Sequence, residues 1–428
     1  MAAAALLICR MNHVRDTYKG RENDSPLDSA FIRKTFEQGD GIFRLKPIFV
    51  PRLFSQPGHR LKLHPDDYFA LGTKRGAMKE RWFSSVISAN NGSLAAPDEG
   101  MSYVTGFDAP DKQFTLKAAV EALGLELIGG ALMAKYGTWP MYSKYFDYSV
   151  PLFHHVHLTF DKAELVGRLG KPECYYFPPQ LNNYPGTFPA TYFGFSPDVR
   201  PEQVRQKLRD FEKGDTRITE LSRAYRIELG TGWYTPAGVI HAPGSYLTYE
   251  PQWNSDVNSV YENVASGEVY SRFFLDENCP DDRKDDIDYI FSLLDWEKNV
   301  DPDYRKHYFR PPVAVPGTPD GCSEVWVTYA NPYVGAKELT VQPKCEVLVK
   351  DQAAYGLILT QGHGRLGQFD CETPTLLRFG QLSADEFFVS EQTAKRGVVI
   401  RNQSAFEPLV MLKHFGPNSG APETVPGN

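Results

Sequence analysis

The hydrophobic residues of this chain fall in short runs separated by glycine, proline and other turn-forming residues. An early stretch, residues 41–54, alternates apolar and polar positions, and its two prolines fit an edge or bent strand. Towards the C-terminus, runs rich in β-branched and aromatic residues occupy residues 323–349, 354–369, 373–390, 396–404 and 407–416. Such β-prone runs at turn-punctuated intervals predict a mainly β protein.

Helical periodicity is restricted to a few segments between these runs. Residues 196–225 predict a helical insertion, because apolar side chains recur on one stripe in its first part. Residues 284–299 predict a second, amphipathic helix. The insertion lies between Glu173 and His241, and a lid is the alternative interpretation of this segment.

Changes in composition divide the chain into four parts. Residues 1–40 are polar and predict an N-terminal arm, and residues 41–300 predict a first barrel with the two helical segments. A Pro-rich connector covers residues 301–322, and residues 323–428 predict a second barrel. A length of 428 residues is long for one core and fits this division.

Composition and charge exclude several classes of partner. The net charge is −7 and no basic cluster is present, so we expect no nucleic-acid partner. The six cysteines are scattered without a CxxC pair, which is typical of reduced thiols and favours the cytoplasm. The apolar start of the chain lacks a preceding positive charge and is too short to span a bilayer, so we expect no membrane association.

Four potential metal ligands occur between residues 150 and 252. His155 and His157 are two apart in a segment that predicts an extended strand, so both imidazoles leave the same face. Glu173 precedes an aromatic run, and a Pro-Ala-Gly turn leads to His241 at the start of another apolar run. On neighbouring strands of a barrel, these residues would form a site with three nitrogens and one carboxylate. Such a site suits Zn, Fe, Mn or Ni.

Short motifs surround these residues: HVH (155–157), GKPE (170–173) and PAGVIH (236–241). They resemble the Gln-x-His, Gly-Lys-Thr-Glu and Pro-Ala-Gly-x-x-His motifs of the type I phosphomannose isomerases, which belong to the cupin superfamily. ERWFSS (80–85) and YEPQWNSDV (249–257) are similar to further segments of that family. The similarity runs from about residue 40 to the C-terminus.

The resemblance implies a metal-dependent aldose–ketose isomerase that is built from two jelly-roll barrels with a small helical segment. Its metal site would hold one divalent ion, for which zinc is expected and Fe, Mn or Ni are alternatives. The implied ligands are His155, His157, Glu173 and His241. His155 stands where the family has a metal-binding glutamine, a change that is compatible with metal binding.

The resemblance also suggests residues that would act on the substrate. Lys171 matches the lysine of the Gly-Lys-Thr-Glu motif, and Glu250 is the candidate acid or base; we expect both to be catalytic. Gln252 and Asp256 are expected to bind sugar hydroxyls. An arginine that the family has after Ser-Asp is absent here, and Arg272 is the nearest downstream arginine that could replace it.

The second barrel is expected to hold no metal and to support the first. It contains His363 and His414, but neither an HxH pair nor a Pro-x-Gly-x-x-His motif. A mononuclear site normally needs three or four converging ligands, and isolated histidines do not supply them.

Two alternatives to the isomerase stay open at this point. One is a non-haem iron dioxygenase, because a His/His/Glu/His ligand set also occurs in cupin oxygenases. The other is a non-catalytic sugar-binding bicupin. Lys171 and the segment 250–256 favour the isomerase over the dioxygenase, since oxygen chemistry does not require them.

The expected partner is a small-molecule sugar. A phosphate needs paired positive charge, and the family's arginine is missing from the matching position near Val260. We therefore predict a preference for a sugar other than mannose 6-phosphate, with unphosphorylated sugars among the candidates. The oligomeric state is left open, a homodimer being one alternative.

Overall fold

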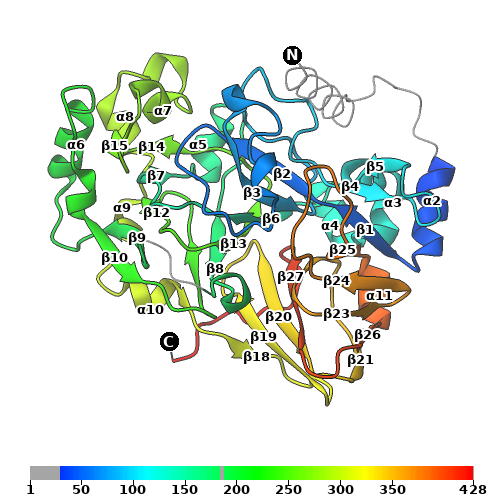
Figure 1. Ribbon diagram of the computed structural model, residues 1–428. Helices are drawn as coiled ribbons and strands as arrows, with labels where there is room; N and C mark the ends of the chain where they lie inside the picture. Colours follow the sequence, from blue (N-terminus) through cyan, green and yellow to red (C-terminus); the bar gives the residue numbers. More distant parts are fainter. Residues whose placement is uncertain (1–28, 184–187, 428) are drawn as a thin grey trace.

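The computed structural model describes residues 29–183 and 188–427, which form two β-barrels with helices at their periphery (Figure 1). Each barrel consists of two antiparallel sheets with a hydrophobic core between them. The predicted mainly β fold with helical insertions is thereby confirmed. In the described part of the chain, no helix has the length and apolar character needed to cross a membrane.

The first barrel combines a seven-stranded and a five-stranded sheet. The seven-stranded sheet has the order β17 (Phe309–Arg310), β11 (Gly232–Thr235), β8 (Glu173–Tyr176), β13 (Thr248–Trp253), β6 (Met141–Phe146), β3 (Ala77–Phe83) and β2 (Ile48–Arg52). The five-stranded sheet has the order β10 (Ser222–Arg226), β9 (Ala190–Phe195), β12 (His241–Ala242), β7 (His155–Val156) and β14 (Ser259–Val260). A short hairpin, β15 (Val264–Ala265) and β16 (Glu268–Val269), follows β14.

The second barrel combines a nine-stranded and a four-stranded sheet. The nine-stranded sheet has the order β18 (Val313–Ala314), β19 (Cys322–Thr328), β20 (Gly335–Val341), β27 (Leu409–Phe415), β22 (Tyr355–Gln361), β25 (Glu386–Val389), β1 (Ile42–Lys46), β4 (Tyr103–Thr105) and β5 (Gln113–Thr115). The four-stranded sheet has the order β21 (Glu346–Val349), β26 (Val398–Asn402), β23 (His363–Leu366) and β24 (Phe369–Glu372).

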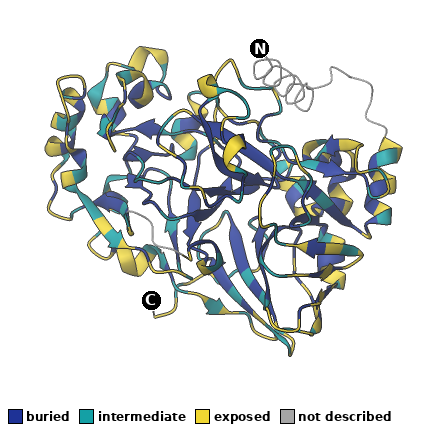
Figure 2. Ribbon diagram, in the orientation of Figure 1, coloured by how far each residue is buried: buried dark blue, intermediate teal, exposed yellow. Residues whose placement is uncertain are grey.

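The two barrels share both a strand connection and a core. β1 pairs with β25 on one side and β4 on the other, so the first of the described strands belongs to the sheet of the second barrel. The predicted boundary at residue 41 therefore does not coincide with sheet membership. Side chains of the seven-stranded and nine-stranded sheets also pack in one cluster, in which Phe49 and Tyr249 meet Ile358 and Leu412. Figure 2 shows these central strands as buried.

Helices cover the outer faces of the barrels (Figure 1). The segments near the nine-stranded sheet are α2 (Ser29–Gln38), α3 (Leu116–Leu127), α4 (Gly130–Tyr136) and α11 (Glu391–Arg396). Those around the first barrel are α5 (Phe160–Glu164), α6 (Pro201–Arg209), α7 (Arg272–Asp276), α8 (Ile287–Phe291), α9 (Trp296–Asn299) and α10 (Tyr304–Tyr308). Short 3₁₀ turns are η1 (Pro65–Asp67), η2 (Thr73–Arg75), η3 (Pro179–Leu181), η4 (Ile218–Leu221) and η5 (Asp281–Arg283).

The N-terminal arm predicted for residues 1–40 is wrong over its last third. Ser29–Gln38 form α2, which buries Ile32 and Phe36 one turn apart. The polar side chains of this segment lie on the opposite face, so its composition concealed an amphipathic helix. Residues 1–28, including the apolar start of the chain, lie outside the described residues.

The helical insertion predicted for residues 196–225 is confirmed only for Pro201–Arg209. Arg217 has a φ of 53°, a left-handed conformation that interrupts a helix. The chain then makes the 3₁₀ turn η4 and pairs as β10 with the edge of β9. The pairing with β9 provides hydrogen-bond partners for the backbone of this segment.

The helix predicted for residues 284–299 is divided into α8 and α9. Asp286 caps α8 by accepting a hydrogen bond from the backbone of Tyr289, and Asp295 caps α9 through the backbone of Lys298. The second cap restarts the helix in a new direction. The connector predicted for residues 301–322 is itself structured, since β17 pairs with β11 of the first barrel and β18 with β19 of the second.

Candidate metal centre

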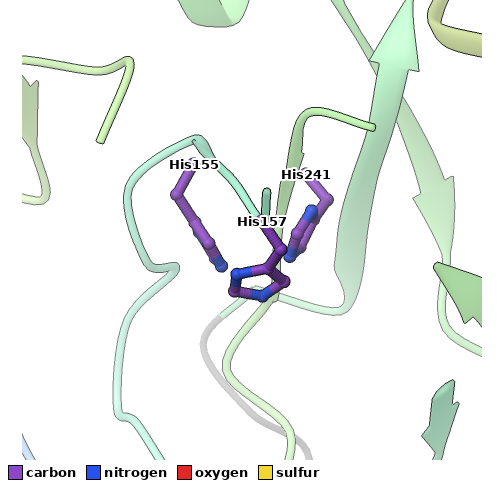
Figure 3. A group of neighbouring side chains, drawn as sticks. All are labelled: His155, His157 and His241. Carbon is purple, nitrogen blue, oxygen red and sulfur yellow. The ribbon is translucent and has the colours of Figure 1, made fainter. Parts of the chain in front are cut away.

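Three imidazoles converge inside the first barrel (Figure 3). His155 lies on β7 and His241 on the neighbouring β12, and the two residues are directly opposite each other in the strand register. His157 follows β7 on the same face. One ring nitrogen of each histidine lies within 4.8 Å of the others, and all three residues are buried. We call this group the histidine cluster.

Each imidazole of the histidine cluster is oriented by a backbone carbonyl. The Nδ1 atoms of His155, His157 and His241 lie 3.0, 2.7 and 2.8 Å from the carbonyl oxygens of Phe153, Val257 and Val239. A carbonyl can only accept, so each Nδ1 donates its proton and each Nε2 keeps a lone pair. Burial lowers the pKa of His155 well below its ordinary value and that of His157 to about 3. The imidazoles of His155 and His157 are therefore neutral, the form that binds metals.

Glu173, the first residue of β8, closes the cluster on one side. Its Oε2 lies 2.9 Å from Nε2 of His157, and its Oε1 lies 3.1 Å from Nε2 of His241. Burial disfavours its charged form, but positive charge at close range, which Lys171 supplies, holds the pKa of Glu173 well below its ordinary value. Oε1 of Glu173 thus faces the lone pair of His241 Nε2, and neither of these two buried atoms has a hydrogen-bond partner. Acceptors that face acceptors in a buried site require a cation between them, so these residues fit a divalent metal ion.

Lys171 supplies one positive charge beside the cluster. Its Nζ lies 2.9 Å from Oε2 of Glu173 and 3.1 Å from Nε2 of His157. The side chain is buried, because it reaches inward from the turn that precedes β8. Lys171 is therefore an internal residue of the site and not a solvated surface lysine.

Glu250 is the second predicted catalytic residue that the structure brings to this place. It lies on β13 opposite Lys144 of β6, and its Oε1 is 3.2 Å from Nζ of Lys144 and 3.6 Å from Nζ of Lys171. Burial and the negative charge of Glu173 raise the pKa of Glu250 to about 8. This carboxyl group can thus hold or release a proton near neutral pH.

Three further charged residues lie beside Glu250 and were not among the predicted site residues: Arg52, Glu80 and Lys144. Glu80 on β3 accepts hydrogen bonds from Arg52 at 2.9 Å, from Trp82 at 2.8 Å and from Tyr148 at 2.9 Å. Lys144 lies 3.8 Å from Glu80 and so joins it to Glu250. The ERWFSS segment contained Glu80, but Arg52 and Lys144 had no motif of their own.

The three predicted substrate-binding residues are placed differently. Asp256 contributes to the cavity wall, where it accepts hydrogen bonds from Arg52 at 2.9 Å and from the backbone of Asn90 at 2.8 Å. Gln252 is buried outside that wall and donates to the carbonyl of Ser255 at 2.8 Å. Arg272 lies on α7 and bonds Asp276 at 3.3 Å, so the structure does not bring it to the cavity.

A cavity of about 840 Å³ opens from the histidine cluster to the surface. Its inner wall carries the charged residues Arg52, Glu80, Lys144, Lys171, Glu173, Glu250 and Asp256. Towards the surface the lining changes to apolar side chains, among them Leu53, Leu94, Val269, Phe273 and Phe274. The volume lies within the range of roughly 300–1,000 Å³ that is usual for small-molecule sites.

The two histidines of the second barrel lie apart from this site and from each other. His363 is exposed on β23, whereas His414 is buried on β27. Nδ1 of His414 lies 2.8 Å from the hydroxyl of Tyr249, and burial lowers the pKa of His414 to about 3. His414 thus connects β27 to β13 of the first barrel.

Comparisons with known proteins bear on the fold. No protein-family model matches the sequence, and no curated protein matches it. Solved structures do match: mannose 6-phosphate isomerase from Bacillus subtilis has a TM-score of 0.54 at 16% identity and covers 88% of this chain and 99% of its own. A variant of phosphomannose isomerase from Salmonella typhimurium has a TM-score of 0.59 at 12% identity and covers 88% and 100%.

A zinc-bound mannose 6-phosphate isomerase is also similar, with a TM-score of 0.57 at 12% identity over 88% of this chain and 99% of its own. The matches extend over nearly the whole of these enzymes, so they include both barrels. At such low identity they establish the architecture of the chain. The resemblance that the motifs suggested is therefore confirmed at the level of the fold: the chain has the two-barrel cupin fold of the phosphomannose isomerases.

Proposed function

We propose that this protein is a metal-dependent aldose–ketose isomerase that acts on a sugar or a sugar phosphate. The proposal is supported above all by the histidine cluster with Glu173, which lies beside Lys171 and Glu250 in one cavity. His155, His157, Glu173 and His241 would hold one divalent ion, zinc being the expected one. When bound, such an ion supplies Lewis-acid stabilisation of the negative charge that develops on the sugar oxygens.

The protein residues account for the proton transfers. Isomerisation moves the carbon-bound proton from C2 of the open-chain aldose to C1 and the hydroxyl proton from O2 to O1. Glu250 takes and returns the carbon-bound proton, and Lys171 gives a proton to O1 and takes the one from O2, so neither group is consumed. Lys171, whose ammonium lies 3.6 Å from Glu250, donates a hydrogen bond to a substrate oxygen as charge develops. Glu173, Lys171 and Glu250 are all buried, so little of these side chains is exposed to bulk water.

The experiment that tests this function is proton exchange at C2 in deuterated water, followed by NMR across a panel of free and phosphorylated sugars. We expect exchange with at least one sugar, and its loss after treatment with a chelator. Oxygen uptake with cleavage of the substrate, without exchange, would favour the iron dioxygenase instead. Sugar binding without either reaction would leave the non-catalytic binding protein as the better description.

A further inference from the structure

The mouth of the cavity is lined by large apolar side chains that are exposed to solvent. Leu53 follows β2, Leu94 lies in the loop after β3, Val269 ends β16, and Phe273 and Phe274 belong to α7. We call these five residues the apolar collar. Val269 is 79% exposed and Leu53 is 73% exposed, so within the described residues no other segment covers these two side chains. Clustered exposure of this kind marks a surface that binds an apolar group.

An unbroken row of aromatic rings joins the collar to the histidine cluster. The ring of His155 lies 5.5 Å from that of Phe153, which lies 4.7 Å from Tyr270. Tyr270 lies 6.2 Å from Phe274, and Phe274 lies 5.5 Å from Phe273 at the rim. All five residues line the cavity. One ligand could therefore contact the histidine cluster and the collar at the same time.

The charges of the cavity do not favour an anion at the outer end. The lining contains five cations, Arg52, Lys74, Arg75, Lys144 and Lys171, and six carboxylates, Glu80, Glu173, Glu250, Asp256, Glu268 and Glu277. Arg52, Lys144 and Lys171 each contact two carboxylates, and Arg75 is bound by Glu99. Lys74 is the one lining cation without a carboxylate contact among the described residues, and a phosphate dianion needs paired positive charge.

The reaction fixes which end of the ligand lies at the collar. C1 and C2 must reach the histidine cluster, and C1 must stay unsubstituted so that the ring can open. Given the proposed isomerase function, we propose that the substrate is a sugar that carries an aromatic or alkyl group at the end remote from its carbonyl. This group lies on the apolar collar, and its burial selects the substrate.

Matched sugar pairs test the collar. Calorimetric titration of the zinc-loaded protein compares mannose, glucose and galactose with their 6-O-benzyl derivatives and with the 6-phosphates. At least one benzyl sugar should bind about tenfold or more tightly than its parent, because a buried aromatic group contributes that much. The Val269→Ser, Phe273→Ser double variant should lose this gain. Phe406→Ser, at a side chain that is 92% exposed on the second barrel, should keep it.

The outcomes separate the collar from the isomerase function. Equal binding within every pair, stronger binding of the phosphates, or an unchanged gain in the double variant would overturn the collar proposal. Benzyl-dependent binding without C2 exchange for any sugar would keep the collar and overturn the isomerase. Sedimentation of the wild type and the double variant tests the remaining alternative, in which the collar is a contact between two copies of the protein. Self-association that depends on the collar, without an effect on sugar binding, would assign it to a protein interface and overturn the proposal.

Discussion

At the residue scale, the orientation of the histidine cluster depends on backbone carbonyls. The carbonyls of Phe153, Val257 and Val239 accept hydrogen bonds from the three Nδ1 atoms. Backbone carbonyls do not titrate, and a side-chain substitution does not remove them. The carbonyls therefore keep the Nε2 atoms of the three rings directed into the site. Preorganised ligands of this kind bind metal without a rearrangement of the site.

The first prediction concerns metal content. His157→Ala should reduce bound zinc from about one equivalent per chain to a small fraction of that, because a mononuclear site needs at least three protein ligands in place. Elemental analysis of protein purified without chelator measures this. His363→Ala, at an exposed histidine of β23, is the matched control and should keep its metal. Undiminished zinc in His157→Ala would show that the metal binds elsewhere.

The second prediction concerns proton transfer. Glu250→Gln keeps the shape of the side chain but removes its acid–base function, so kcat should fall about 10²–10⁴-fold. Zinc content should stay unchanged, because Glu250 contacts Lys144 and Lys171 rather than the histidine cluster. Glu268→Gln, at another carboxylate of the cavity lining, controls for the loss of one negative charge. An unimpaired rate of C2 exchange in Glu250→Gln would assign the proton transfer to a different group.

Local motifs predicted part of this site and could not predict the rest. The HxH spacing and the Pro-Ala-Gly turn singled out three histidines, which the fold does bring together. Arg52, Glu80 and Lys144 meet only because β2, β3 and β6 are neighbours in one sheet, and sequence spacing carries no information on that pairing. Arg272 illustrates the opposite error: closeness in sequence to the Ser-Asp segment did not place it at the cavity.

At the element scale, the short helix α9 holds the turn that delivers His241. The side-chain amide of Asn299 donates to the carbonyl of Gly238 at 2.7 Å, and its oxygen accepts from the backbone of Ile240 at 2.8 Å. Gly238 has a φ of 83°, which favours glycine in this turn. The apolar periodicity of residues 284–299 predicted one long helix and therefore gave no separate role to α9. Periodicity does not reveal that Asp295 caps the start of a new helix within this segment.

The third prediction follows from this contact. Asn299→Ala leaves the buried N–H of Ile240 without a partner, so unfolding in urea should show a loss of about 1–3 kcal/mol. Zinc affinity should fall about 10- to 100-fold, since the variant loosens the support of a metal ligand. Competition with a chromogenic chelator measures the affinity.

Glu297→Ala is the control for this variant, since Glu297 is an exposed residue of the same helix. It should retain both stability and zinc affinity. A stable Asn299→Ala variant with unchanged zinc affinity would show that the Pro-Ala-Gly turn holds its shape without α9.

At the scale of the whole molecule, a buried charge cluster joins the barrels. Arg81 on β3 of the first barrel donates two hydrogen bonds of 2.8 Å to Asp385 and lies 3.3 Å from Glu386 on β25 of the second. All three side chains are buried. One guanidinium faces two carboxyl groups, and like charges in a dry site cannot both ionise without cost.

The last prediction concerns the pH dependence of stability. Burial, opposed by Arg81 and reinforced by Asp385, raises the pKa of Glu386 from 4.5 to about 8. Between these pH values the folded protein keeps a proton that the unfolded chain has lost. Stability from this group is therefore complete below about pH 4.5 and declines as the pH rises towards 8, by at most about 1.4 kcal/mol per pH unit.

Glu386→Gln isolates this contribution, because a glutamine cannot ionise and all other titrating groups remain. Urea unfolding of both proteins between about pH 5 and pH 8 measures the difference in their free energies of unfolding. The wild type should lose stability relative to the variant across this range, and the difference should level off above about pH 8. A constant difference would mean that Glu386 stays ionised in the folded state. Arg81 would then balance both carboxylates, and the contact between the barrels would be insensitive to pH.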